Sequence, residues 1–329
     1  MRLFSDTLLD WYDANGRDLP WRRTRDPYAI WLSEIILQQT RIAQGRSYWE
    51  RFLQAYPDVQ ALAAAQEDDV LRLWQGLGYY SRARNLLTAA RQIAAQGRFP
   101  DTLEGIRALK GVGDYTAAAI ASFAFGIPAA VVDGNVYRVL ARHFGIPTPV
   151  GSTAAKKEFT ALAQSLLPPD RPGDFNQAMM DFGATLCTPA SPACARCPLA
   201  DSCAALATGR VDSLPVREKG AAVQERRFDY VYVRFRGRTA IRRRGTGDIW
   251  AGLYEPLVCD PGSGGSRGKL LKKGVKHQLT HRTLIVDFYL WEPAEEPALP
   301  EGWSWIEEAE LDRYAKPRLF ELLLEALPK

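Results

Sequence analysis

The sequence lacks any long apolar segment. No apolar run in its 329 residues approaches the roughly 18 residues that a membrane-spanning helix needs. The first 21 residues carry acidic side chains and no apolar core, which argues against a secretory signal. We therefore expect a protein of the reducing cytoplasm that has no membrane partner.

A strong excess of one charge is also absent. The net charge is only +4, which by itself is weak support for a polyanionic partner. Arginines are nevertheless concentrated locally, in residues 22–25 and again at Arg82 and Arg84. These groups are interpreted either as a nucleic-acid contact or as ordinary solvated surface.

Cysteine is scarce, but four of the five cysteines lie within 17 residues. They follow the spacing C-x6-C-x2-C-x5-C, at Cys187, Cys194, Cys197 and Cys203. This spacing differs from the paired C-x2-C ligands of a zinc ribbon, and a four-thiolate iron–sulfur cluster fits it better. Disulfide pairing is the alternative, and it is disfavoured because nothing marks the chain for export.

Strand-like alternation is missing from residues 1–205. Apolar residues recur there at helical spacing, and glycines and prolines stand where helices should stop. The pattern predicts an all-α region with helices at 28–44, 46–55, 67–75, 81–96, 115–125 and 134–144.

The character changes after a polar segment, 206–224, which we interpret as a linker. Residues 225–329 contain alternating or β-branched runs, which predict strands, and they end in two short helical segments. The prediction is an α+β domain with strands at 228–237 and 283–291, a flexible loop at 260–270, and helices at 307–313 and 317–327.

Three local patterns carry possible chemistry. The turn Gly111-Val112-Gly113 separates two predicted helices, so it predicts a helix-hairpin-helix whose backbone N–H groups suit a phosphate, although a purely structural hairpin uses the same turn. Asp133 precedes a predicted helix, where it is either an ionised catalytic group or a plain N-cap. Glu34 stands among apolar residues, so burial would raise its pKa as a general acid requires; a polar-surface position is the alternative.

The order of these patterns resembles the endonuclease III-like DNA glycosylases over residues 1–205. Within that superfamily the chain is most similar to the MutY-type adenine glycosylases, which remove adenine mispaired with 8-oxoguanine. The matching strings are LPWR at 19–22, WLSEIILQQT at 31–40, GLGYYSRARNL at 77–87 and VDGNVYRV at 132–139. The resemblance implies a six-helix module at 26–133, a cluster module built from 1–25 and 134–205, and a [4Fe-4S] cluster on the four cysteines.

The resemblance also implies a mechanism. Glu34 would protonate adenine N7, and Asp133 would stabilise the oxocarbenium-like sugar. Tyr115 and Asn135 would position the carboxylates and water, and Arg22 would contact the adenine. Bifunctional relatives carry a nucleophilic lysine at the place of Tyr115, and a phenol cannot form a Schiff base, so we expect a monofunctional enzyme.

The expected partner is double-stranded DNA with adenine opposite 8-oxoguanine or guanine, bound by a monomer. The resemblance assigns the residues that enter or contact the duplex as Gln39, Thr40, Tyr79, Arg82, Gly111, Val112 and Gly113. Residues 225–329 resemble the Nudix-like domain of this family. That domain lacks the metal-binding carboxylates of a hydrolase here. The positions that match the Phe-Ser-His-like triplet, which checks for the lesion in the family, are Leu279, Thr280 and His281. An ordinary strand-end histidine is the alternative interpretation of His281.

Three other functions compete with this interpretation. An endonuclease III-type enzyme would remove oxidised pyrimidines and cut the strand, but Tyr115 opposes it. A catalytically silent lesion-binding protein is disfavoured because Glu34 and Asp133 are both present. A pure electron carrier is a poor fit for one cluster in a chain of this size.

Overall fold

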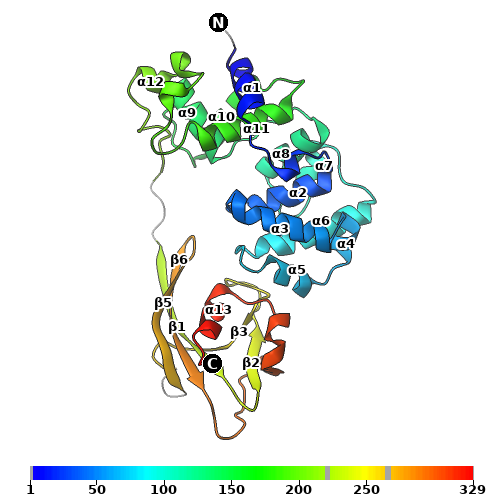
Figure 1. Cartoon of the computed structure of the whole chain (residues 1–329), viewed down its shortest axis with the longest axis vertical. Helices are drawn as coiled ribbons and strands as arrows, with labels where there is room; N and C mark the ends of the chain where they lie inside the picture. Colours follow the sequence, from blue (N-terminus) through cyan, green and yellow to red (C-terminus); the bar gives the residue numbers. More distant parts are fainter. Residues whose placement is uncertain (1–2, 219–222, 264–267, 329) are drawn as a thin grey trace. The chain divides into compact units, whose positions relative to one another are not determined.

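The chain folds into two compact units in the computed structural model, which describes residues 3–218, 223–263 and 268–328 (Figure 1). Unit 1 comprises Met1–Ala63 and Thr88–Lys219, and unit 2 comprises Ala64–Leu87 and Gly220–Lys329. The division of the chain at 205 and 225 stays a prediction. No helix among the described residues is long and apolar enough to cross a membrane.

Unit 1 is helical, which confirms the predicted fold class. Its core includes a cluster of side chains from α1, α9, α10 and α11, such as Leu8, Leu140, Phe159 and Phe182. Its elements, with α6 crossing into unit 2, are α1 Phe4–Asn15, η1 Pro20–Arg22, α2 Pro27–Leu37, α3 Ile42–Ala55, α4 Val59–Ala64, α6 Ser81–Gln96, α7 Leu103–Arg107, α8 Asp114–Phe125, α9 Gly134–Phe144, α10 Thr153–Leu166, α11 Pro172–Thr185, η2 Cys194–Arg196, η3 Ala200–Ser202 and α12 Ala204–Ala207.

The single helix predicted at 28–44 is wrong, because two helices occupy this stretch. Helix α2 ends at Leu37, and Gln39 has a left-handed backbone with φ 57°, which a continuing helix cannot contain. The two helices pack so closely that a Cβ on Gly45 would lie 2.6 Å from the side chain of Leu37. Apolar spacing continues through the break because both helices bury a face.

The segment predicted as a linker at 206–224 lies partly outside the described residues. Its first part packs on unit 1, where the Val150 amide donates a hydrogen bond to the Val216 carbonyl at 2.8 Å. The backbone of Arg217 pairs with Val150 as an isolated parallel bridge. The chain therefore remains packed on unit 1 as far as Arg217, well beyond the cysteine loop.

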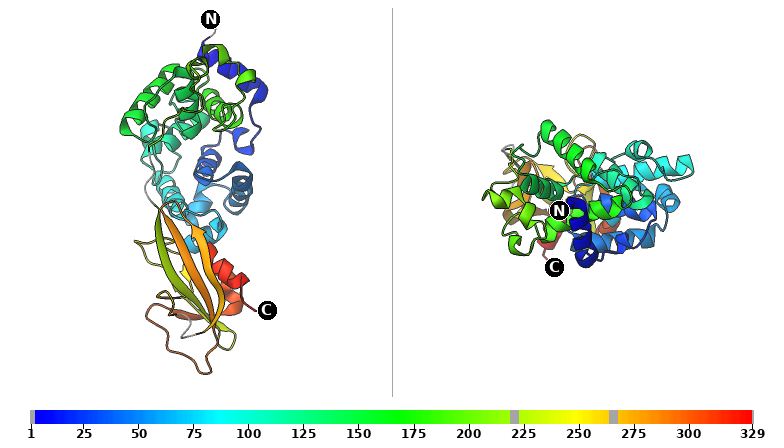
Figure 2. Two further views of the ribbon diagram at one scale, coloured as in Figure 1. Left: turned by 90° about the vertical axis from the view of Figure 1, so that its left-hand side faces the viewer. Right: turned by 90° about the horizontal axis from the view of Figure 1, so that it is seen from above.

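Unit 2 contains two sheets, which confirms the α+β prediction (Figures 1 and 2). The larger sheet has the order β4-β1-β6-β5, with β1 parallel to β6 and β5 antiparallel to β6. The smaller has the order β3-β2-β7. The elements are α5 Glu67–Trp74, β1 Gln224–Val233, β2 Arg238–Arg243, β3 Tyr254–Glu255, β4 Leu257–Cys259, β5 Lys269–Gln278, β6 Arg282–Trp291, β7 Ser304–Glu307, η5 Glu308–Arg313 and α13 Arg318–Glu325.

The core of unit 2 lies between the larger sheet and α13. Phe228, Tyr230 and Phe288 from the strands pack in one cluster with Leu319 and Phe320 from the helix. Several predicted boundaries differ from the structure, two of them substantially. Strand β1 ends at Val233, before a turn in which Arg236 has φ 50°, and β5 already begins at Lys269, within the predicted loop.

Candidate active site

Glu34 lies on α2, a helix that Asp26 caps by accepting a hydrogen bond from the Tyr28 amide. Almost every side chain of α2 is buried, and Glu34 itself is only 9 % exposed. This burial raises the pKa of Glu34 to about 7; a hydrogen bond from Tyr115 and the charge of Arg22 oppose the rise, and Asp133 adds to it. The geometry therefore excludes the polar-surface interpretation of this carboxyl.

Asp133 caps the N-terminus of α9. Its Oδ1 accepts hydrogen bonds from the amides of Asn135 and Val136, both at 2.8 Å, and its Oδ2 accepts one from the Asn135 side chain, also at 2.8 Å. Three hydrogen-bond donors thus converge on this carboxyl group at the N-terminal end of the helix. The same contacts fix the orientation of the carboxyl group, and therefore the direction of the oxygen lone pairs that these bonds do not use.

The two carboxyl groups line one cavity of about 780 Å³. A volume of this size falls in the usual range for ligand sites. Burial also raises the pKa of the Tyr115 phenol well above its ordinary value, so this group is a neutral donor. The described residues that line the cavity include Arg22, Glu34, Tyr115, Asp133, Asn135, Gln177 and Met180.

The predicted phosphate-binding turn lines the same cavity. Helices α7 and α8 form the hairpin, with Gly111 at φ 77° and Gly113 as the N-cap of α8. Apart from Gly113 and its two chain neighbours, no atom of the described residues lies within 4 Å of where a Cβ on Gly113 would be, so a ligand can approach this backbone. Gln39 and Thr40 also line the cavity, whereas Val112 is buried.

Asp181, which the sequence patterns did not single out, fixes the position of Arg22. Its carboxylate is fully buried and accepts hydrogen bonds from Arg22 Nη1 at 2.8 Å and Nη2 at 2.9 Å. Arg17 binds the same carboxylate through Nε at 2.7 Å. Paired burial of this kind makes the carboxylate costly to remove, since two guanidinium groups would lose their partner.

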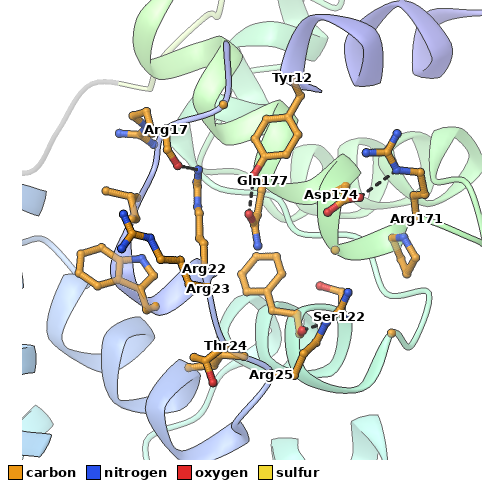
Figure 3. Close-up of a pocket in the computed structure, with 18 of the residues that line it drawn as sticks. Tyr12, Arg17, Arg22, Arg23, Thr24, Arg25, Ser122, Arg171, Asp174 and Gln177 are labelled. Carbon is orange, nitrogen blue, oxygen red and sulfur yellow. Dashed lines mark hydrogen bonds and ion pairs between the residues drawn. The ribbon is translucent and has the colours of Figure 1, made fainter. Parts of the chain in front are cut away.

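Gln177 is a second residue that was missed. It lines the cavity, and its Oε1 accepts a 2.6 Å hydrogen bond from the Tyr12 hydroxyl. An adjoining cavity of about 410 Å³ shares Arg17, Trp21, Arg22 and Gln177 with the first (Figure 3). No local pattern marked Gln177, because its contact with Tyr12 joins residues 165 positions apart in the chain.

The four clustered cysteines line a single small cavity and are free thiols. Arg142 donates to Cys187 Sγ at 3.5 Å, and Arg138 Nε donates to the Cys187 carbonyl at 2.7 Å. Arg138 Nη2 also donates to Asn135 Oδ1 at 2.8 Å, so this guanidinium joins the cysteine loop to the cap of α9. Among the described residues no three Cys, His, Asp or Glu side chains are placed to hold a single metal ion.

The predicted lesion-reading residues lie in unit 2. Tyr79 is 47 % exposed with φ 47°, and its hydroxyl shares a 2.6 Å hydrogen bond with Thr280 Oγ1. Leu279, Thr280 and His281 form the turn between β5 and β6, and with Tyr79 they line a cavity of about 700 Å³. Arg82 is instead buried against the Trp74 and Tyr79 rings, where burial lowers its pKa to about 10.

Comparison with known proteins agrees with this architecture. The model of the HhH-GPD superfamily of base excision DNA repair proteins matches residues 32–169, and the NUDIX domain model matches residues 230–326. The adenine DNA glycosylase of Buchnera aphidicola from Acyrthosiphon pisum is 34 % identical over 255 residues, which cover 77 % of this chain and 73 % of that protein. The chain belongs to the adenine DNA glycosylase family.

Other relatives match a shorter part. The human adenine DNA glycosylase is 48 % identical over 213 residues, which are 61 % of this chain and 39 % of that protein. The chain thus spans less than half the length of the mammalian relatives it matches. A thermostable thymine-DNA glycosylase has a TM-score of 0.57 at 32 % identity over 62 % of this chain and 95 % of that one. An endonuclease III–DNA complex, with a TM-score of 0.53 at 22 % identity over 62 % of this chain and 94 % of that one, shows the shared fold.

Proposed function

We propose that the chain is a monofunctional DNA glycosylase that hydrolyses the N-glycosidic bond of adenine opposite 8-oxoguanine or guanine in duplex DNA. The observation that carries the proposal is that Glu34, with its pKa raised to about 7, and Asp133, held by three donors, line one cavity. Two carboxyl groups in such different environments can serve as acid and anion at the same pH.

The reaction begins when the adenine nucleotide leaves the base stack and enters the cavity, at a cost of about a few kcal/mol. Glu34 donates its proton to N7, and the C–N bonding pair leaves with the now neutral base. Asp133 faces the positive charge that develops on the sugar. Water then bonds to the anomeric carbon, and its proton restores the acid form of Glu34.

Base recognition falls to Gln177 and Arg22. The Gln177 amide offers a donor and an acceptor, which is the pairing that the edge of adenine presents. Because Tyr12 and Asp181 hold these two side chains, little order is lost when the base binds.

Strand cleavage through a Schiff base is not expected. Among the described residues that line the cavity there is no lysine, and the place of the lysine nucleophile is held by the Tyr115 phenol. Lys110 precedes the hairpin turn and is exposed, with its backbone amide bound to Gln92. The endonuclease III-type alternative has no amine to start its chemistry here.

We propose that the helix-hairpin-helix and the neighbouring loop hold the DNA. Gly111, Val112 and Gly113 would present backbone N–H groups to a phosphate, and Gln39 and Thr40 would enter the duplex from the cavity mouth. Tyr79 would stack beside the lesion, and Leu279, Thr280 and His281 would read 8-oxoguanine. Arg82 would hold the Tyr79 ring in place, since its guanidinium lies against one face of that ring.

The cysteine loop fits one [4Fe-4S] cluster. Four thiols surround a common cavity, and Arg142 next to Cys187 would balance part of the thiolate charge. A single ion would need its ligands gathered at about 2.3 Å, an arrangement the described side chains do not offer. Hydrolysis moves no electrons, so the cluster would order the loop and, through Arg138, the cap of α9.

A single-turnover assay tests the proposal. Duplexes carry adenine opposite 8-oxoguanine, with thymine, cytosine or guanine replacing the adenine as controls. We expect adenine release, strand breaks only after alkali, and no borohydride-trapped adduct. Release of a pyrimidine, or a borohydride-trapped adduct formed as adenine leaves the duplex, would contradict the assignment.

A further inference from the structure

Strand β5 carries an unusual concentration of one charge. Lys269, Lys272, Lys273 and Lys276, here called the lysine row, are all exposed on this strand. Residues 268–286 contain no acidic residue, although the whole chain has a net charge of only +4. No ion pair joins a lysine of the row to any carboxylate among the described residues.

The arginines of unit 2 behave differently. Arg226 pairs with Asp248 at 2.7 Å, Arg242 with Glu255 at 2.6 Å, and Arg318 with Glu325 at 2.7 Å. Unit 2 therefore neutralises much of its positive charge internally. The lysine row keeps an excess of positive charge even with the Asp287 carboxylate of β6 beside Gly274, and such an excess attracts a polyanion.

The position of β5 makes the lysine row accessible. The strand lies at the edge of the larger sheet, beside β6 (Figure 2). Its register against β6 shifts between Leu270 and Lys272 and again between Lys272 and Val275, and the Gly274 amide donates to Asp287 Oδ1 at 2.6 Å. A regular strand would turn Lys272 and Lys273 to opposite faces, and these irregularities expose both.

We propose that the lysine row contacts the phosphates of the duplex that flanks the base pair read by residues 279–281. The inference rests on the proposed function, because it places this turn at the lesion. At about 3.3 Å per residue along β5, the row starts roughly 7 Å from Gln278 and ends about 30 Å from it. At about 3.4 Å per base pair, that distance corresponds to about two to nine base pairs of flanking DNA.

A different role for edge lysines is to prevent sheets from pairing edge to edge. The two roles differ in their dependence on salt. Each phosphate contact releases counterions and adds about 0.9 to the slope of log affinity against log salt, whereas a solvated lysine adds none.

The test compares full-length variants by fluorescence anisotropy on an undamaged 30-base-pair duplex between 50 and 200 mM salt. Replacing Lys272, Lys273 and Lys276 by glutamine should reduce the slope by about 2.7, so the parent loses about 40-fold more affinity over this range than the variant does. Arginine at the same three positions should restore the parent slope.

The matched control replaces Arg72, Arg98 and Arg313 by glutamine. Each of these is exposed and ion-paired, with Asp69, Asp101 and Glu310 respectively, so the net charge changes by the same amount. The control should keep the parent slope. Equal slopes for the two variants, or a parent slope in a lysine variant that self-associates, would overturn the proposal.

Adenine release by the parent chain is measured separately. A parent that releases no adenine, combined with a reduced slope for the lysine variant, would refute the proposed function and leave the lysine row as a DNA contact. Adenine release by the parent combined with an unchanged slope for the lysine variant would support the proposed function and refute the lysine row as a DNA contact.

Discussion

The raised pKa of Glu34 makes a quantitative prediction about the pH dependence of base excision. A general acid works only while protonated. With a pKa of about 7, about a quarter of the molecules carry the proton at pH 7.5, whereas an ordinary glutamic acid with a pKa of 4.5 would be protonated in about one molecule per thousand. Burial therefore increases the active fraction by about 200-fold at that pH.

The measurement is the second-order rate constant for adenine release, taken with enzyme below saturation from pH 5.5 to 9. Under these conditions the profile reports the free enzyme, the state to which the pKa applies. We expect a falling limb that bends near pH 7 and then drops about tenfold per pH unit. A rate that already falls about tenfold per pH unit at pH 5.5, as a pKa near 4.5 would give, or a rate that is independent of pH above 7, would refute the reasoning.

The same pKa predicts a stability cost with a defined sign. The folded protein keeps the Glu34 proton between pH 4.5 and about 7, where the unfolded chain loses it, so the free energy of unfolding falls as pH rises through this window. The full difference corresponds to about 3 kcal/mol above pH 7. Glu34→Gln removes a buried charge and should therefore stabilise unit 1 at pH 8 but not at pH 4, as followed by hydrogen exchange of the α2 amides. Equal protection of the two proteins at pH 8 would count against a buried, ionising carboxyl.

Two further substitutions test the surroundings of the site. Asp181→Asn should lower the free energy of unfolding by about 3–5 kcal/mol, because it leaves two guanidinium groups without their carboxylate, and it should slow adenine release. A melting temperature like that of the parent would show that these ion pairs contribute little to stability. Tyr115→Lys should place an amine in the cavity and give a borohydride-trapped adduct on the adenine duplex, with Lys110→Arg in the same background as the control; absence of an adduct would mean that this position does not face the sugar.

Much of the site could be predicted from the sequence because its patterns are local. The apolar neighbours of Glu34 left its burial open against a polar-surface position, which the combination with the other patterns then made the weaker alternative, and the position of Asp133 before a helix indicated its cap. Asp181 could not be found this way, because its partner Arg22 lies 159 residues away in the chain. Arg82 was expected at the DNA, and nothing in its local sequence showed that its guanidinium would lie against Trp74.

The fold likewise contains elements that local sequence patterns predicted and elements that they did not. Helical spacing predicted the positions of α3, α6, α8 and α9, whereas α1, α4, α7, α10 and α11 were not predicted as separate elements. It also ran through the break after Leu37, because α2 and α3 each bury a face on either side of it. Strand β6 coincides with a β-branched run in the sequence, and its bounds were predicted almost correctly. Strand β5 was missed because two register shifts remove the alternation by which a strand is recognised.

The most direct test of the central claim is adenine release by Glu34→Gln under single-turnover conditions, with enzyme saturating over a duplex carrying adenine opposite 8-oxoguanine. The amide has nearly the same shape as the acid but has no proton to give to N7. We predict an affinity for the duplex close to that of the parent and a rate of release lower by about 10²- to 10⁴-fold. Release at the parent rate would contradict the claim that a neutral Glu34 and an anionic Asp133 act on one extruded adenine nucleotide.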